Sequence, residues 1–93
     1  MKYKIFDYSF KQAKKIGVVI KPSITQGKKI DVFDKAGNYL TSIGDINYLD
    51  YPSYIKLFGK RYADERRKLY KIRHQRYRTK KNTRSWFADQ ILW

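Results

Sequence analysis

The 93-residue chain contains no cysteine, one histidine and only eight acidic residues, against twenty-two lysines and arginines. Without cysteine it has no disulfide bond, no thiolate metal site and no cysteine nucleophile, which fits a reducing compartment. No stretch is long and apolar enough to cross a bilayer, and the first ten residues lack the apolar core of a secretory signal. We therefore expect no membrane insertion and an intracellular or particle-enclosed protein.

The apolar and aromatic content indicates a folded chain despite its net charge of +14. Hydrophobic residues make up 42% and aromatic residues 17% of the sequence, enough to form a small core. The length predicts one domain over residues 1–93, with a sheet-forming half (1–50) and a basic helical half (51–93). Self-repulsion among the cations lowers the stability of this domain, and a bound polyanion would relieve it.

Short-range patterns predict the elements of the first half. Alternation over residues 2–6 indicates a short strand. Ser9 and Gln12 have the spacing of a capping box, so the sequence predicts a helix that starts at Ser9 and ends at Gly17, which suits the left-handed C′ position. A second short strand follows at residues 18–20.

Residues 28–44 give the clearest β signal. Ile30 and Val32 alternate with polar positions, residues 35–38 form a turn that tolerates positive φ, and residues 39–43 return. This segment is predicted to be a β-hairpin.

The second half is predicted to be helical. Pro52 suits the first turn of a helix, and Gly59 divides a short helix (52–58) from a long one (60–79). Apolar residues recur at helical spacing and are expected to face the core: Ile55, Phe58, Tyr62, Leu69 and Ile72.

A polar linker, Lys80 to Thr83, separates the long helix from a final one at residues 86–93, which Thr83 or Ser85 would cap. The apolar content of that end favours docking on the body, with an anchor for a partner protein as the alternative. The expected fold is α+β: a small antiparallel β-hairpin or sheet with a short N-terminal helix, a long basic helix and a short C-terminal helix.

Most of the positive charge lies in residues 56–84, where thirteen lysines and arginines face only Asp64 and Glu65. Such an excess favours contact with the phosphates of nucleic acid. The candidate nucleic-acid-binding residues are Lys60, Arg61, Arg66, Arg67, Lys68, Lys71, Arg73, Arg76, Arg78, Lys80, Lys81 and Arg84. The alternatives are contact with acidic capsid proteins, or a solvated helix face with pairs such as Asp64–Lys68.

Three tyrosines lie among these cations. Tyr62, Tyr70 and Tyr77 could stack on unpaired bases. We favour Tyr62 in the core and Tyr70 at its rim. No RRM-like, KH-like or zinc-finger spacing is present, so sequence-specific readout has no motif to support it.

The sequence predicts no catalytic residue, no metal site and no cofactor. The lone His74 lies between Arg73 and Arg76, which hold it neutral, and it has no partner for a metal site. Four carboxylates have the composition of a metal-dependent nuclease, but their spacing fits turns and helix caps better: Asp31, Asp34, Asp45 and Asp50.

A set of short motifs runs through the chain: DINYLDYPSYI at 45–55, Lys29-Ile30-Asp31-Val32, Ser42-Ile43-Gly44, Gly59, Tyr62-Ala63, Arg66-Arg67, Leu69-Tyr70, Arg73-His74, and Ala88 with Ile91-Leu92-Trp93. Over roughly residues 9–93 this pattern resembles a family of small basic proteins of large double-stranded DNA viruses of eukaryotes. The resemblance implies a viral origin and a location in the virion or in the nucleus or cytoplasm of the infected cell, and it carries no activity. The linker 80–84 departs from the pattern because it lacks a glycine.

We therefore expect a non-enzymatic, basic viral structural or packaging protein that contacts nucleic acid through phosphates, with duplex DNA as the favoured form. The alternative is a minor capsid or scaffold component that binds acidic protein surfaces. A small DNA-processing enzyme is third.

Overall fold

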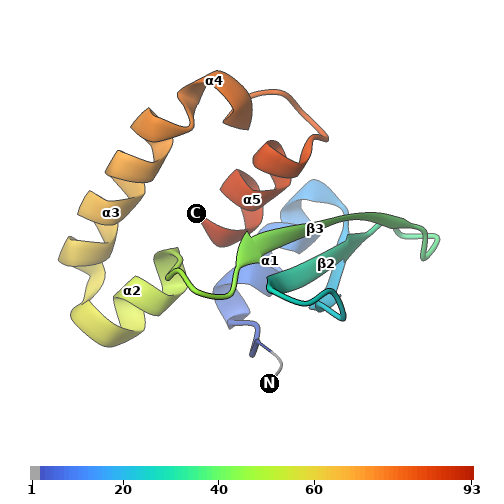
Figure 1. Ribbon diagram of the computed structural model, residues 1–93, viewed down its shortest axis with the longest axis horizontal. Helices are drawn as coiled ribbons and strands as arrows, with labels where there is room; N and C mark the ends of the chain where they lie inside the picture. Colours follow the sequence, from blue (N-terminus) through green and yellow to red (C-terminus); the bar gives the residue numbers. More distant parts are fainter. Residues whose placement is uncertain (1–2) are drawn as a thin grey trace.

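The computed structural model describes residues 3–93 and has the expected α+β architecture (Figure 1). Three antiparallel strands form a sheet in the order β1-β2-β3. The elements follow in the order α1 (Asp7–Ile16), β1 (Val19–Pro22), β2 (Lys28–Phe33), β3 (Tyr39–Asp45), α2 (Tyr51–Phe58), α3 (Lys60–Arg73), α4 (Gln75–Arg78) and α5 (Arg84–Leu92).

The predicted hairpin is confirmed as β2 and β3. Ile30 pairs with Ile43, and both side chains are buried. Gly37 has a φ of +91° in the connecting turn, a conformation that favours glycine. The strand predicted at residues 18–20 is confirmed as β1, whose Ile20 pairs with Val32. These pairs form the sheet's contribution to the core.

The C-terminal helix α5 completes the core, as its composition predicts. Phe87, Ile91 and Leu92 are buried in one apolar cluster with Ile30 and Ile43 of the sheet. Figure 1 shows α5 lying next to α1 and the sheet, although α5 is the last helix in the sequence. The core thus joins the two halves of the chain.

The prediction of a capping box at the start of the first helix is wrong. Helix α1 already begins at Asp7, and its N-cap residue makes no side-chain hydrogen bond. Ser9 Oγ instead donates to the carbonyl of Ile91 at 2.9 Å, and Gln12 Nε2 donates to the carbonyl of Gln90 at 3.0 Å. Because the two residues lie one turn apart on one face, they meet the open carbonyl end of α5 together. The end of α1 at Gly17 is confirmed by its φ of +78°.

The strand predicted at residues 2–6 is also wrong for the described part, residues 3–6, while residue 2 lies outside the described residues. Tyr3 is held by its side chain rather than by a strand ladder. Its hydroxyl donates to Asp50 Oδ2 at 2.6 Å, next to the start of α2.

Helices α2, α3 and α4 form an arc around one side of α5 (Figure 1). Gly59 separates α2 from α3, as predicted. The long helix expected to reach residue 79 ends at Arg73, and α4 follows after a break at His74. Arg78 Nε donates to the carbonyl of Lys71 at 3.2 Å, so the chain folds back to satisfy a carbonyl in the last turn of α3.

The apolar residues predicted to face the core through α2 and α3 largely face solvent. Tyr62 and Leu69 are each 47% exposed, whereas Ala63 and Tyr70 are buried. The predicted positions of Tyr62 and Tyr70 are therefore reversed. The helical spacing correctly identified a row of apolar residues along α3, but it could not show which face of the helix packs against the rest of the protein.

The linker before α5 contains a left-handed residue even though it has no glycine. Asn82 has a φ of +69°, which asparagine tolerates better than most residues. Thr83 Oγ1 then accepts a hydrogen bond from the Trp86 backbone N–H at 3.3 Å, which confirms the predicted cap of the last helix.

Candidate nucleic-acid interface

The twelve candidate cations lie on α3, α4, the following loop and the start of α5, and four of them are engaged within the molecule. The paired residues are Lys60 and Arg67, with Asp64, and Lys71 and Arg78, with Asp89. Lys71 and Arg78 have a structural role because their partner Asp89 is buried, whereas Lys60 and Arg67 form exposed or half-exposed pairs that add little stability.

Asp64 holds one of the two groups. Its carboxylate accepts a hydrogen bond from the Tyr51 hydroxyl at 2.6 Å and lies 2.9 Å from Lys60 Nζ and 3.6 Å from Arg67. These contacts, the Tyr51 hydroxyl first and Lys60 next, lower the pKa of Asp64. The local pair expected with Lys68 forms with Lys60 instead.

Asp89 holds the other group. It is buried on α5, with Lys71 Nζ at 2.7 Å and an Arg78 nitrogen at 3.7 Å. A buried carboxylate is tolerated only when it is paired, so these cations bind α5 to α3 and α4.

Eight candidate cations have no ion-pair partner among residues 3–93. Seven of them are exposed, and we call them the basic surface: Arg61, Lys68, Arg73, Arg76, Lys80, Lys81 and Arg84. The eighth, Arg66, is half-buried. Arg84 makes one polar contact, to Thr41 Oγ1 at 3.4 Å. The pairing inside the molecule therefore leaves seven exposed, unpaired cations between residues 61 and 84, with Glu65 as the one exposed acid in the same range.

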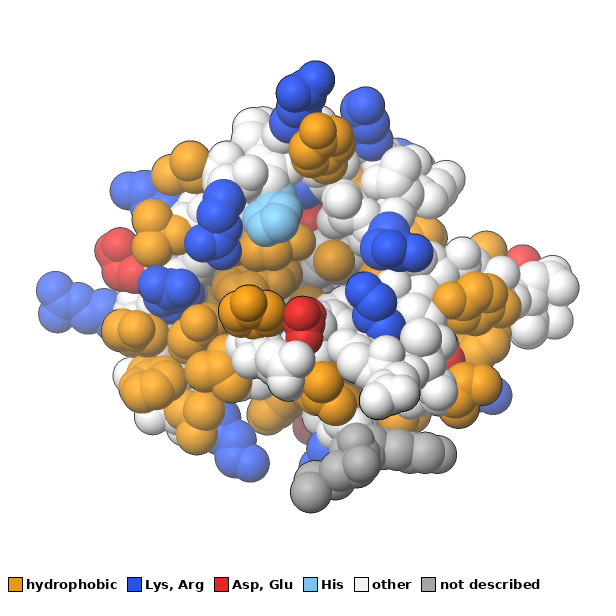
Figure 2. Space-filling model, in the orientation of Figure 1, with side chains coloured by type: hydrophobic (Ala, Val, Ile, Leu, Met, Phe, Trp, Pro, Cys, Tyr) orange, Lys and Arg blue, Asp and Glu red, His pale blue; other side chains and the backbone are white. Residues whose placement is uncertain are grey.

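Apolar side chains are exposed beside these cations. We call them the apolar strip: Leu57, Phe58, Tyr62, Leu69 and Ile72. In Figure 2, apolar side chains gather at the outer corner where α2 meets α3. Tyr77 is also exposed, and Arg76 lies 5.6 Å and Lys80 5.9 Å from the centre of its ring. Among the three tyrosines considered for stacking, Tyr77 is thus the one held between cations at the surface.

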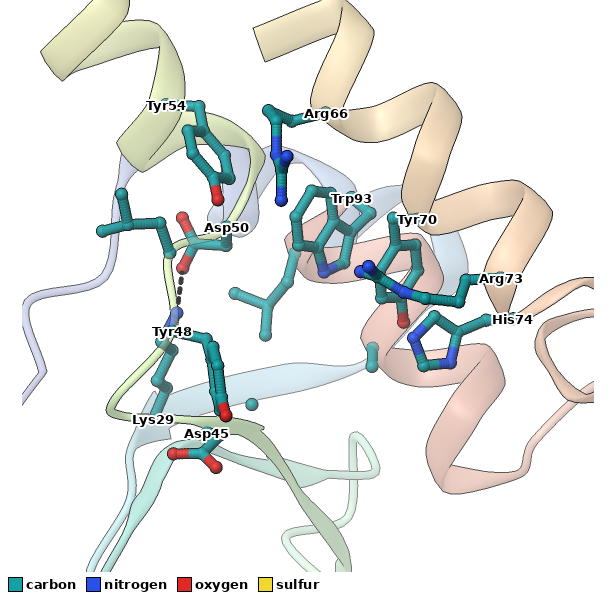
Figure 3. A pocket seen from close by; sticks show the side chains of 14 residues that line it. Lys29, Asp45, Tyr48, Asp50, Tyr54, Arg66, Tyr70, Arg73, His74 and Trp93 are labelled. Carbon is teal, nitrogen blue, oxygen red and sulfur yellow. Dashed lines mark hydrogen bonds and ion pairs between the residues drawn. The ribbon is translucent and has the colours of Figure 1, made fainter.

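A pocket of about 500 Å³ lies between the start of α2, helix α3 and the end of α5 (Figure 3). Sequence reasoning missed it, because no local spacing connects residues that come from strands, loops and three helices. Its labelled walls are Lys29, Asp45, Tyr48, Asp50, Tyr54, Arg66, Tyr70, Arg73, His74 and Trp93. Figure 2 shows a hollow on this face with lysine or arginine side chains on both sides of it.

One wall of the pocket is a row of stacked rings. The rings of Trp93 and Tyr70 are 4.3 Å apart and 8° from parallel, and His74 lies 4.3 Å from Tyr70 on the same row. Figure 3 shows the three rings in the order Trp93, Tyr70, His74. The ring of Tyr54 lies 6.1 Å from that of Trp93. The wall is therefore rigid, aromatic and partly polar at its edges.

The charges in the pocket do not cancel. Lys29 and Asp50 neutralise each other as a buried pair at 2.9 Å. Arg66 has its Nε buried without a hydrogen-bond partner, and its guanidinium carbon lies 5.5 Å from the centre of the Tyr54 ring. Arg73 is exposed at the pocket wall and has no ion pair within residues 3–93. Asp45 also lines the pocket, so Lys29, Arg66 and Arg73 face the two carboxylates of Asp45 and Asp50 and leave a net charge of +1. This surplus favours an anionic ligand.

His74 is held neutral, as predicted, although the leading cause differs. Burial and then the positive charge of Arg73 lower its pKa, while Asp89 opposes them. Burial raises the pKa of the neighbouring Tyr70 to about 12. Both rings are thus uncharged at neutral pH.

The aspartates considered for a nuclease serve local structure. Asp34 accepts hydrogen bonds from backbone N–H groups of the hairpin turn, and Asp45 accepts one from the Asn47 N–H. Asp50 caps α2 by accepting a hydrogen bond from the Ser53 N–H. Asp31 departs from that prediction: it is buried in β2 and accepts hydrogen bonds from the Ser23 and Ser42 hydroxyls. Within residues 3–93 no group of three His, Asp or Glu side chains is arranged to hold a metal ion.

Comparison of the chain with protein-family models, with curated proteins and with solved structures finds no match. None of the helices in the described part of the chain combines the length and the apolar character needed to span a membrane.

Proposed function

We propose that this protein is a non-enzymatic nucleic-acid-binding protein that contacts phosphates through the basic surface. The observation that carries this proposal is the set of seven exposed cations left without ion-pair partners among residues 3–93, within the segment from Arg61 to Arg84. Each cation that meets a phosphate releases counterions, so several together give strong, salt-dependent binding. A polyanion would also relieve the self-repulsion of the +14 chain.

Duplex DNA is the proposed form of the main ligand, with little dependence on base sequence. Phosphate contacts position a protein without specifying sequence, and the chain carries no motif for reading base edges. The resemblance to the viral family adds a structural or packaging role for a viral genome, and a location in the virion or the infected cell, as part of the same proposal.

Fluorescence anisotropy with blunt duplexes of unrelated sequence tests this proposal. Four exposed cations outside the pocket are changed together to glutamine: Arg61, Lys68, Arg76 and Lys81. The matched control changes four exposed lysines in the N-terminal segment: Lys4, Lys11, Lys14 and Lys15. Both variants lose four charges, but only the first should lose most of its affinity. Equal losses would place the contact elsewhere, and no binding at low salt would refute the proposal.

The apolar strip favours a second candidate, a capsid or scaffold component whose cations meet an acidic protein surface. Exposed apolar side chains bordered by charge are a common feature of protein interfaces and add nothing to phosphate contact. Changing Leu69 and Ile72 to glutamine should then abolish association with an acidic protein partner while leaving duplex binding unchanged. If neither binding property depends on the strip, this candidate falls.

A further inference from the structure

We propose that the pocket between α2, α3 and α5 binds one unpaired nucleotide, with its base against the row of rings and its phosphate at Arg66 and Arg73. This inference deepens the proposed function and rests on it, because it names the part of a nucleic acid that the pocket takes. Four observations support it: an unsatisfied arginine, an aromatic wall, a fitting volume and a surplus of positive charge.

Arg66 provides the first observation. Its Nε is buried and makes no hydrogen bond, although burying a donor without an acceptor is unfavourable. Neither carboxylate that lines the pocket pairs with Arg66. Asp50 already accepts hydrogen bonds from Tyr3, Lys29 and the Ser53 N–H, and Asp45 accepts one from the Asn47 N–H. An anionic oxygen in the pocket would pair with the partly exposed guanidinium group and would reach the buried Nε after a small shift of the Arg66 side chain. A phosphate matches the planar donor fork of arginine especially well.

The row of rings provides the second. Trp93 is fixed in its plane by stacking on Tyr70, which in turn stacks on His74. Both faces of Tyr70 are covered by its neighbours, so a base can stack only at an end of the row, on the outer face of Trp93 or of His74. Such an end face is already ordered, and base–aromatic stacking tolerates any base. Tyr54 and Tyr48 also line the pocket and add aromatic surface next to the row of rings.

Volume and charge restrict the ligand class further. About 500 Å³ is in the range that holds a ligand of nucleotide size. Surplus arginine disfavours an organic cation, for which an aromatic cage would otherwise be suited. A neutral aromatic compound would leave Arg66 unsatisfied.

The nucleotide must be unpaired. A base inside a duplex is stacked on both faces and paired along its edge, so it reaches such a wall only at an end, a gap or an extruded position. Arg73 belongs both to the pocket wall and to the basic surface, so a strand whose phosphates follow the basic surface can place one nucleotide in the pocket. The protein would then prefer junctions between duplex and single strand over blunt duplex.

The direct test is titration of deoxyadenosine monophosphate, followed by the fluorescence of Trp93 in a Trp86→Phe background. Saturable quenching is expected at micromolar to millimolar ligand. Inorganic phosphate and deoxyadenosine, tested separately, should each bind at least tenfold more weakly. Phosphate binding as tightly as the nucleotide would overturn the proposal, because the base would then play no part.

Arg66→Gln and Arg61→Gln form the matched pair of variants. Each removes one cation from α3, but Arg61 is exposed and does not line the pocket. Arg66→Gln should weaken nucleotide binding at least tenfold, and Arg61→Gln by less than twofold. Arg66→Lys keeps the charge without the planar guanidinium, so its nucleotide affinity should lie between those of the two glutamine variants. Thermal melting followed by circular dichroism checks that each variant is folded. Equal effects of Arg66→Gln and Arg61→Gln would refute the pocket assignment.

A comparison of oligonucleotides separates this inference from the proposed function. A duplex with an unpaired three-nucleotide end should bind at least fivefold more tightly than the blunt duplex, and Arg66→Gln should remove that difference. The inference alone would be overturned if the blunt duplex bound in a salt-dependent way, the unpaired end added no affinity and the free nucleotide did not bind. Failure of every nucleic acid to bind, together with saturable nucleotide binding, would overturn the proposed function and limit the pocket to free nucleotides.

Discussion

Lys29 Nζ lies 2.9 Å from Asp50 Oδ2, and the two side chains are only 4% and 1% exposed. The pair joins the central strand β2 to the N-cap residue of α2. The Asp50 carboxylate also caps α2 through the Ser53 N–H and accepts a hydrogen bond from the Tyr3 hydroxyl, so it connects the N-terminal segment, β2 and α2. The arc of α2 and α3 is thereby held against the sheet, with the pocket beside it.

Replacing Lys29 with methionine should destabilise the protein by about 3–5 kcal/mol, because it leaves a buried carboxylate without its cation. Urea unfolding measures the loss. Adding Asp50→Asn should recover part of it, since asparagine can still cap α2 without a buried charge. Lys60→Met, which breaks the exposed pair with Asp64, should leave the unfolding free energy nearly unchanged. A similar loss in Lys29→Met and Lys60→Met would contradict the structural role given to the buried pair.

Gly44 and Gly37 allow backbone strain to be separated from close packing. Both have positive φ, but a Cβ on Gly44 would lie 2.8 Å from Leu92 Cδ1 and 3.0 Å from Lys29 Cδ, whereas one on Gly37 would meet nothing within 4 Å. Gly37→Ala should cost about 1 kcal/mol from strain alone, and Gly44→Ala a further 1–3 kcal/mol or so from overpacking. Thermal unfolding should show a drop of about 4–8 °C for each kcal/mol. Equal melting points would mean that α5 does not pack against β3 as described.

The contact between Ser9 and the end of α5 gives a third prediction. Ser9→Ala leaves the buried carbonyl of Ile91 without its donor and should cost about 1–3 kcal/mol in urea unfolding. Ser85→Ala is the control, because the Ser85 hydroxyl makes no hydrogen bond within residues 3–93. A loss as small as that of Ser85→Ala would contradict the contact between Ser9 and the end of α5.

Alkaline pH should destabilise the fold through its buried tyrosines. Burial, with a contribution from the charge of Asp89, raises the pKa of Tyr70 to about 12 in the folded protein, against about 10 in an unfolded chain. The unfolded chain therefore loses the Tyr70 proton first. The stability is complete below pH 10 or so and falls as the pH rises toward about 12, by up to ~1.4 kcal/mol per pH unit for this group. Urea unfolding at several pH values should show a smaller fall for Tyr70→Phe, and an identical fall would contradict the burial of this hydroxyl.

Local signals in the sequence were sufficient where one short segment decides the structure. Gly37 and Gly59 mark a turn and a helix break because few other residues adopt positive φ, and Thr83 supplies the acceptor that a helix start needs. Ser9 and Gln12 show the limit of such signals. Their spacing fits a cap and fits equally well a pair of donors that meet another helix, and only the position of α5 decides between them.

The face of α3 and the pocket could not be predicted for the same reason. The stripe through Tyr62 and Leu69 and the face that carries Ala63 and Tyr70 both have helical spacing, and tertiary packing selects the second. Asp89 pairs with two cations of this segment, Lys71 and Arg78. The count of thirteen cations against two acids in residues 56–84 leaves Asp89 out, so it overstates the free positive charge. The pocket joins residues as distant as Lys29 and Trp93.

The salt dependence of duplex binding tests the central proposal most directly. The association constant of the unmodified chain is measured from about 50 to 200 mM salt, beside the variant that lacks Arg61, Lys68, Arg76 and Lys81 and its lysine control. We predict a steep linear fall of log K with log salt concentration. The slope should become shallower by up to about 0.9 for each phosphate contact that the variant loses, and stay unchanged in the control. A flat response of the unmodified chain, or equal slopes in all three proteins, would contradict phosphate contact by the basic surface.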